Sequence, residues 1–423
     1  MKKLIAATAL LLTCVACFAQ TVLNPQANLS PAEQAVAVAQ RLIDKNAKNF
    51  EAYNALALAL SRRARETSDV KFYSQAEEAL QKSFAISPHN FDGERIHVWL
   101  LLGKHEFAAA LGEATKLSRR MPDDVMIYGF LTDSNVELGS YKEAEAACQR
   151  MLDLRTGNLP AITRAAYLRE LFGDVDGALE LMNSALASTP PGQAEDGAWI
   201  LVQMAHLQLS VGNLTEAEQL LQRALIMFPG YHYALGNLAK VRIQQKRYDE
   251  AVVLLQQRYQ AASHAENLYE LAVALQLAGR KAEAGKAFAE FELKSLKETY
   301  LADNSNHELI SYYVNYAHEP AKALEVAERE YGRRQDVFTL DSYALALYAN
   351  DRYGEARKQI ETALAVGVRN ANMLTHAGQI CLKAGDKAAA KRYLQQAAEL
   401  NSAGSAEAKV LRAQLQSKPY LSR

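Results

Sequence analysis

Residues able to do acid–base, nucleophilic or metal chemistry are scattered through this 423-residue sequence without a catalytic spacing. The sequence contains no Gly-x-Ser-x-Gly, no glycine-rich loop ending in Lys-Ser or Lys-Thr, no His-Glu-x-x-His and no Cys-x-x-Cys. No two of the nine histidines lie four residues apart, which is the helical spacing of a metal site. We therefore expect no catalytic residue, no metal site, no cofactor and no enzymatic activity. An enzyme or regulatory subunit with an unrecognised site stays as the less favoured alternative.

The four cysteines do not predict a disulfide framework. Cys14 and Cys17 lie in the apolar N-terminal segment, whereas Cys148 and Cys381 stand far apart inside predicted helices. In a linear stack of helices the second pair would be far beyond the ~5.5 Å Cα separation of a disulfide. We expect both to be small buried hydrophobic residues.

The first 19 residues have the order of a bacterial secretory signal peptide. Lys2 and Lys3 precede an apolar run, which is followed by small residues and then by Gln20. Such a signal peptide would direct export of this protein, and cleavage after Ala19 would release the mature chain into the periplasm or outside the cell. Val15-Ala16-Cys17 also resembles a lipobox, so a lipoprotein anchored at Cys17 is the alternative, although Cys14 matches such a box poorly. Residues 20–30 are expected to be a flexible lead, with Ser30 and Pro31 opening the first helix.

Composition and charge narrow the class of partner. The 47 basic and 48 acidic residues are well mixed along the sequence. This argues against a nucleic-acid partner, because proteins that bind nucleic acids carry an excess of basic residues on one face. After the start, no stretch of ~18 apolar residues predicts a transmembrane span. Helix-forming residues dominate and prolines number only 10. Other proteins or peptide segments are the expected partners.

A repeated alanine reveals the elements that organise the chain. Its spacing is 33 or 34 residues, or 39 at two places, a period that fits two helices and two turns. The repeated positions are Ala76, Ala110, Ala144, Ala178, Ala217, Ala251, Ala284, Ala323, Ala356 and Ala389.

Other residues keep the same phase. A small residue stands twelve positions earlier, as in Ala205 and Ala239, and lets two helices approach closely. A bulky residue such as Tyr248 stands three positions earlier. Glycine recurs five positions earlier, where a helix ends in a left-handed residue, at Gly139, Gly173, Gly212 and Gly279. Proline recurs twelve positions later and stops the second helix, at Pro88, Pro122, Pro190 and Pro229.

This combination resembles the tetratricopeptide repeat family over roughly residues 52–401. The resemblance implies an all-α, right-handed superhelical solenoid of about ten antiparallel helix pairs. Two copies depart from the pattern: the first has a seven-residue insertion within residues 62–74, and the eighth has Pro320 in place of the bulky residue. We expect about seven repeats in residues 31–302, and about three repeats plus a capping helix (405–416) in residues 303–416. An extended helix over residues 284–301 precedes the second block. The run over residues 333–347 of this block, followed by His376-Ala377-Gly378, resembles exported bacterial repeat proteins without assigned activity.

The resemblance also implies a concave groove lined by the first helix of each pair. Its second, fifth, ninth and twelfth positions would face inward and hold partner-binding residues: Trp99, Tyr167, Trp199, Val202, His206, Tyr233, Lys240, Tyr269, Phe338 and Tyr348. Aromatic side chains there are either binding anchors or space-filling residues between helices. The ninth positions of the third to sixth pairs do not match the carboxylate clamp of chaperone-binding members.

We therefore expect a non-enzymatic scaffold of the bacterial cell envelope that binds a partner segment in its concave groove. A lipid-anchored accessory factor in envelope assembly or secretion is the alternative.

Overall fold

The computed structural model describes residues 29–400 except 68, 191, 302 and 303, and this part is an all-α helical solenoid without strands. A first helix, α1 (Pro31–Lys45), precedes ten helix pairs in the described residues. The pairs are α2 (Phe50–Thr67) with α3 (Lys71–Ile86), α4 (Phe91–Gly103) with α5 (Phe107–Arg120), α6 (Val125–Glu137) with α7 (Tyr141–Leu154), α8 (Leu159–Leu171) with α9 (Val175–Ser188), α10 (Ala194–Ser210) with α11 (Leu214–Met227), α12 (His232–Gln244) with α13 (Tyr248–Ala261), α14 (Ala265–Leu277) with α15 (Lys281–Glu298), α16 (Asn306–Tyr312) with α17 (Pro320–Tyr331), α18 (Val337–Ala349) with α19 (Tyr353–Leu364), and α20 (Ala371–Lys383) with α21 (Lys387–Leu400).

The predicted signal peptide with Cys17, residues 20–28 of the predicted lead and the predicted capping helix 405–416 lie outside the described residues. Ser30 does cap α1: its hydroxyl accepts a hydrogen bond from the Glu33 N–H, and the Glu33 carboxylate accepts one from the Ser30 N–H.

The phased alanines hold each pair together, as predicted. Each lies on the second helix of its pair and is at most 3% exposed. The small residues twelve positions earlier, such as Ala205 and Ala239, are equally buried on the first helix. Two helices therefore meet through small side chains, which permits the short interaxial distance that the repeat needs.

In the last pair the repeat position lies one residue later than predicted, at Ala390 instead of Ala389. Gly385, with φ of 87°, ends α20, and it lies five residues before Ala390 rather than Ala389. Both alanines are buried. The run of three alanines at 388–390 made the position ambiguous in the sequence, and the turn glycine resolves it.

The two irregular copies take distinct local structures. The first-copy insertion extends α2 to Thr67. In the eighth pair, α16 passes into a π-helical turn (Tyr313–Ala317) and a left-handed His318 before Pro320 begins α17. Proline is tolerated there because the first helical N–H needs no partner.

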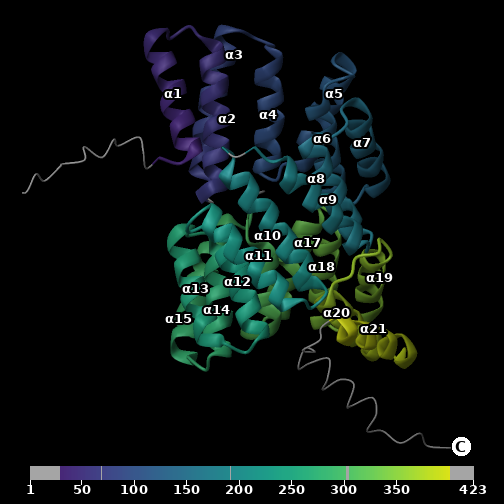
Figure 1. Ribbon diagram of the computed structural model, residues 1–423. Helices are drawn as coiled ribbons and strands as arrows, with labels where there is room; N and C mark the ends of the chain where they lie inside the picture. The colour runs from purple at the N-terminus through teal and green to yellow at the C-terminus, as the bar shows by residue number, and fades with distance from the viewer. Residues whose placement is uncertain (1–28, 68, 191, 302–303, 401–423) are drawn as a thin grey trace, which may run out of the picture.

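The solenoid does not run on as an open rod, because its later pairs pack against earlier ones. In Figure 1, α18 lies close to α8, and Leu168 and Leu171 of α8 share a core with Val337 and Leu340 of α18, although more than 160 residues separate the two helices. One core joins Val136, Ala144 and Cys148 of α6 and α7 to Val337 and Leu340 of α18. We call this contact the seam. The linear stack assumed above in placing the two cysteines therefore does not describe this part of the chain, because long-range apolar burial brings later pairs back onto earlier ones.

Backbone hydrogen bonds and two glycines complete the seam. The Gln335 N–H donates to the Glu137 carbonyl, and the Val337 N–H donates to the Tyr141 hydroxyl, both over 3.0 Å. A Cβ at Gly139 would lie 2.7 Å from the Gln335 carbonyl oxygen, and one at Gly173 would lie 2.6 Å from that of Gly367. These turn glycines therefore provide close backbone approach as well as positive φ.

Cys148 and Cys381 are free and buried, as expected. Another core runs from Ala239 and Phe291 to Leu309 and Tyr313, so apolar packing is continuous across residues 302 and 303. None of the described helices is both long and apolar enough to cross a membrane.

Candidate binding cavity inside the solenoid

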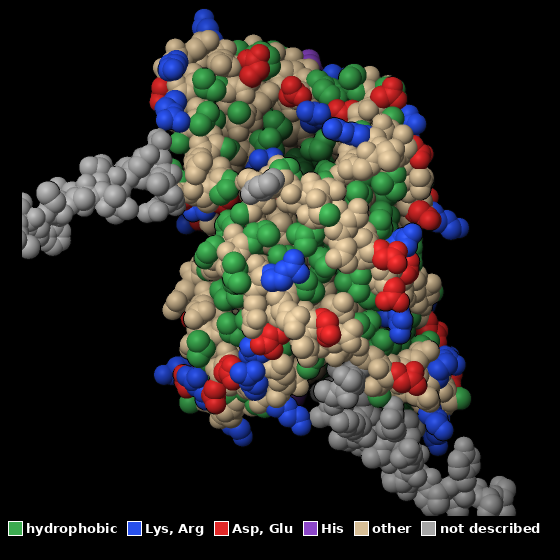
Figure 2. Space-filling view, in the orientation of Figure 1, with side chains coloured by type: hydrophobic (Ala, Val, Ile, Leu, Met, Phe, Trp, Pro, Cys, Tyr) green, Lys and Arg blue, Asp and Glu red, His purple; other side chains and the backbone are tan. Residues whose placement is uncertain are grey.

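The inner faces of α2, α4, α6, α8 and α10 surround a cavity of about 820 Å³, which we call the main cavity. Figure 2 shows the molecule hollowed between the part formed by α2 to α4 and the part formed by α6 to α8. Its volume lies within the range of ligand-binding pockets. First helices of successive pairs line it because each pair presents that helix to the inside of the curve.

Three aromatic side chains from three repeats stand in the wall of the main cavity: Trp99 on α4, Tyr167 on α8 and Trp199 on α10. Trp99 packs edge-on against Phe130, with ring centroids 6.3 Å apart. Trp199 rests on the core formed by α8 to α12 and is partly exposed. These residues offer large, rigid apolar surfaces that are held in place from behind. Both tryptophans of the chain thus line one cavity.

The polar part of the wall is predominantly acidic. Six carboxylates and three arginines line the main cavity. Arg65, at the end of the extended α2, pairs with Glu195 and Asp196 at the start of α10, the latter over 2.9 Å. This pair bridges the first and fifth helix pairs, so the insertion in the first copy contributes directly to the enclosure.

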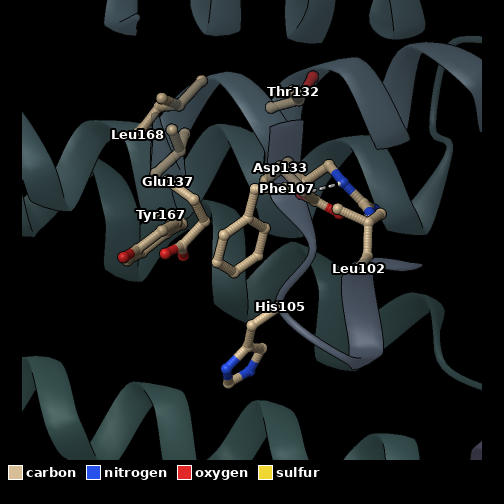
Figure 3. A pocket seen from close by; sticks show the side chains of 10 residues that line it. Leu102, His105, Phe107, Thr132, Asp133, Glu137, Tyr167 and Leu168 are labelled. Carbon is tan, nitrogen blue, oxygen red and sulfur yellow. Dashed lines mark hydrogen bonds and ion pairs between the residues drawn. The ribbon is translucent and has the colours of Figure 1, made fainter. Parts of the chain in front are cut away.

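A smaller side pocket of about 270 Å³ opens next to the main cavity, between the end of α4, α6 and α8 (Figure 3). Its wall is shared with the main cavity at Asp133, Glu137, Arg164 and Tyr167. In Figure 3, Glu137 and Tyr167 lie on one side of the Phe107 ring and Asp133 lies on the other. Apolar side chains, including Leu102, Phe107 and Leu168, complete the pocket.

The two carboxylates of the side pocket differ in how they are paired. Asp133 accepts two hydrogen bonds from the Arg164 guanidinium, over 2.7 and 2.5 Å. Glu137 has a longer contact of 3.3 Å with Arg334, whose Nε atom lies nearer to Glu330, at 2.9 Å. Burial, together with repulsion from Asp336, raises the pKa of Glu137 to about 7. Glu137 is therefore a carboxylate whose charge is incompletely compensated.

A series of polar pairs links the inner faces of successive first helices. Glu170 of α8 contacts His206 of α10 at 2.8 Å, and Lys240 of α12 contacts Glu270 of α14 at 3.3 Å. The series continues from Asp341 of α18 to His376 of α20, at 2.8 Å. These pairs fix the relative positions of neighbouring repeats along the inner surface.

Three of the ten predicted partner-binding residues meet in the main cavity: Trp99, Tyr167 and Trp199. The predicted His206 and Lys240 lie on the inner face in the pairs just described. Val202 is a correction, because it is 2% exposed and belongs to the core. Trp199 and Gln203, four residues apart on α10, face the cavity instead, and Val202 points to the neighbouring helices.

The remaining predicted residues lie away from the main cavity. Tyr233 contacts Tyr231 and His232 and packs on the core of α8 to α12. Tyr269 packs against Phe291, with centroids 5.1 Å apart. Phe338, at the start of α18, is 37% exposed, whereas Tyr348 packs against the core of the seam.

Sequence reasoning missed Arg65 and Glu137. Glu137 follows Asp133 by four residues on the same helix, so the periodicity of α6 could have placed it on the inner face. Arg65 carried no such signal, because its partners lie 130 residues further along the chain. Within the described ranges, no group of His, Cys, Asp and Glu residues could hold a metal ion.

Two family models, each described as a tetratricopeptide repeat, match residues 208–260 and 344–405. The first match runs from the end of α10 through most of α13, and the second begins within α18 and includes α20 and α21. The same pair geometry and buried alanine recur before the first of these segments and between the two. The chain is a tetratricopeptide-repeat protein.

Solved structures give only distant likenesses. The type IV pilus biogenesis factor PilW is 13% identical, with a TM-score of 0.41 over 47% of this chain and 91% of that chain. The human IFIT1 dimer with PPP-AAAA is 13% identical, with a TM-score of 0.48 over 88% and 95%. The Cut9 and Hcn1 hetero-tetramer of the APC/C gives 13% identity and a TM-score of 0.36 over 91% and 93%. No curated protein matches the chain.

Proposed function

We propose that this protein is a non-enzymatic interaction scaffold of the bacterial cell envelope, which holds a segment of a partner polypeptide in its main cavity. The observation that carries the proposal is the convergence of Trp99, Tyr167 and Trp199, from three repeats, on one cavity of about 820 Å³. Tetratricopeptide repeats serve protein–protein interaction, and rigid aromatic residues in a concave site are typical binding anchors.

The envelope location rests on the N-terminal sequence, in which two lysines, an apolar run and small residues precede Gln20. A lipid anchor at Cys17 is the second form of the proposal, because Val15-Ala16-Cys17 resembles a lipobox. Mass spectrometry of the mature protein distinguishes the two: a free N-terminal Gln20 supports soluble export, and a diacylglyceryl Cys17 supports an anchored accessory factor. A retained Met1 contradicts both.

Polypeptides are proposed as partners, rather than nucleic acids, because basic and acidic residues balance over the chain and the cavity wall is acidic. The proposal assigns no reaction. Two acidic side chains of the main cavity are held in structural pairs, Asp133 with Arg164 and Glu195 with Arg65.

Site-specific photocrosslinking in cells that express the full chain tests the proposal. A photoreactive residue replaces Tyr167 inside the main cavity or, as a matched control, Ile226, which is 81% exposed on α11. The expected result is a covalent adduct of defined mass at position 167 that is absent at position 226. Adducts at 226 and none at 167 would place the partner on the outer surface and refute cavity binding.

A further inference from the structure

We propose that the side pocket beside Glu137 binds one lysine or arginine side chain of the polypeptide held in the main cavity. The inference rests on the proposed function, and it states which partner chemistry the site selects. Its basis is the size, wall and charge of the side pocket.

The size and position of the side pocket suit one side chain of a larger ligand. Its volume of about 270 Å³ is below the range of ~300–1,000 Å³ that small-molecule sites occupy. Asp133, Glu137, Arg164 and Tyr167 line both this pocket and the main cavity. A segment bound in the main cavity could therefore extend a side chain past these residues into the side pocket.

The walls match a long side chain with an apolar stem. Leu102, Phe107 and Leu168 provide apolar surface along the pocket. Lysine and arginine bury their methylene stems on such surface while the charged group reaches a polar partner. The Phe107 and Tyr167 rings stand on either side of the Glu137 carboxylate in Figure 3, so a cation at Glu137 would also meet aromatic groups.

The charge at the wall shared by the side pocket and the main cavity is complementary to a cation. Arg164 is committed to Asp133, and Arg334 divides its contacts among Glu137, Glu330 and Asp336, at 3.3, 2.9 and 3.9 Å. The Glu137 side chain retains 26% exposure. A ligand cation would compensate a carboxylate that the protein leaves under-compensated, whereas a ligand anion would be repelled.

The pKa of Glu137, raised to about 7 by burial and by Asp336, agrees with this deficit of positive charge. A cation bound beside it would favour the ionised carboxylate. The charged groups around Glu137 are Asp133 on its own helix, and Arg334 and Asp336 from the segment before α18.

The test uses the immobilised full chain and a degenerate library of acetylated, amidated nonapeptides without cysteine or tryptophan. Wild type is compared with Glu137→Gln, which keeps the size and can still accept a hydrogen bond, and with Glu137→Asp, which keeps the charge. Glu216→Gln, on the exposed face of α11, is the matched control. Retained peptides are sequenced, and the best lysine peptide and its norleucine analogue are titrated against the fluorescence of Trp99 and Trp199.

Wild type and Glu216→Gln should enrich lysine or arginine at one peptide position, and the lysine peptide should bind about tenfold more tightly than its norleucine analogue. Glu137→Gln should abolish both preferences without weakening the norleucine peptide, and Glu137→Asp should retain a preference. Retained peptides without a basic position, or a preference that Glu137→Gln leaves intact, would overturn the inference and leave cavity binding standing. Retention of no peptide by wild type would overturn the proposed function and the inference with it.

Discussion

Closure of the solenoid at the seam predicts that two chemically identical substitutions will have different effects. Gly139→Ala and Gly279→Ala each place a methyl group on a turn glycine between the helices of a pair, with φ of 75° and 76°. At Gly279 an added Cβ meets nothing within 4 Å, whereas at Gly139 it lies 2.7 Å from the Gln335 carbonyl oxygen. Because that oxygen belongs to the backbone, it cannot rotate away.

The magnitudes separate the two variants. A non-glycine residue in the left-handed region costs roughly 1–2 kcal/mol, and both variants bear this cost. Forcing a methyl group into a closely packed contact costs about 1–3 kcal/mol more, and this falls on Gly139→Ala alone. The seam should therefore open roughly 5- to 150-fold more often in Gly139→Ala than in the control.

Hydrogen–deuterium exchange followed by mass spectrometry reads this opening locally. The amides of Gln335 and Val337 donate across the seam to Glu137 and Tyr141, so the peptide covering residues 333–339 should lose protection in Gly139→Ala. It should remain protected in Gly279→Ala. Equal exchange of this peptide in both variants would refute the seam as a closing contact.

Three further predictions concern the cavity and its surroundings. Trp199→Ala should weaken partner capture at least about tenfold, measured by crosslinking yield, and leave the helicity unchanged. Tyr233→Ala removes a residue packed on the core, so it should lower the unfolding midpoint measured by circular dichroism. The opposite pattern would show that Tyr233 is the binding residue and Trp199 the core residue. Arg65→Ala should make Trp99 and Trp199 more accessible to acrylamide quenching because the bridge from α2 to α10 is lost, and unchanged quenching would show that the bridge does not enclose the cavity. Burial and neighbouring carboxylates raise the pKa of Glu308 to about 8, so the folded protein keeps this carboxyl group protonated at pH values where the unfolded chain has lost the proton. The stabilisation from this difference is lost as the pH rises through 8. Between pH 7 and 9, wild type should lose about 1 kcal/mol more stability than Glu308→Gln in urea titrations, and parallel profiles would contradict this.

Much of the fold could be predicted because it follows from contacts that are local in sequence. Each pair needs a small residue at the contact, a left-handed residue between its helices and a stop after the second helix, as Ala217, Gly212 and Pro229 illustrate. These requirements recur with one period, so ten copies support one another. The run of alanines at 388–390 allowed more than one phase, and Gly385, five positions before Ala390, is the local feature that decides between them.

The seam and the enclosure could not be predicted, because they depend on how small rotations between pairs accumulate along the solenoid. Arg65 meets Glu195, and Gln335 meets Glu137, only after several repeats have curved the chain. The same reason limits the candidate site. Helical position placed Trp99, Tyr167 and Trp199 on the inner face, but it could not show that they share one cavity while Tyr269 and Phe338 lie elsewhere.

If a partner polypeptide occupies the interior of the solenoid, it must cover the tryptophans, because both line the main cavity. Acrylamide quenching of the full chain with and without its captured partner measures this. Saturation with the partner should shield Trp99 and Trp199 together, and single Trp→Phe variants should show the effect at each position. A partner that binds at saturation while both tryptophans remain as accessible as in the free protein would contradict it.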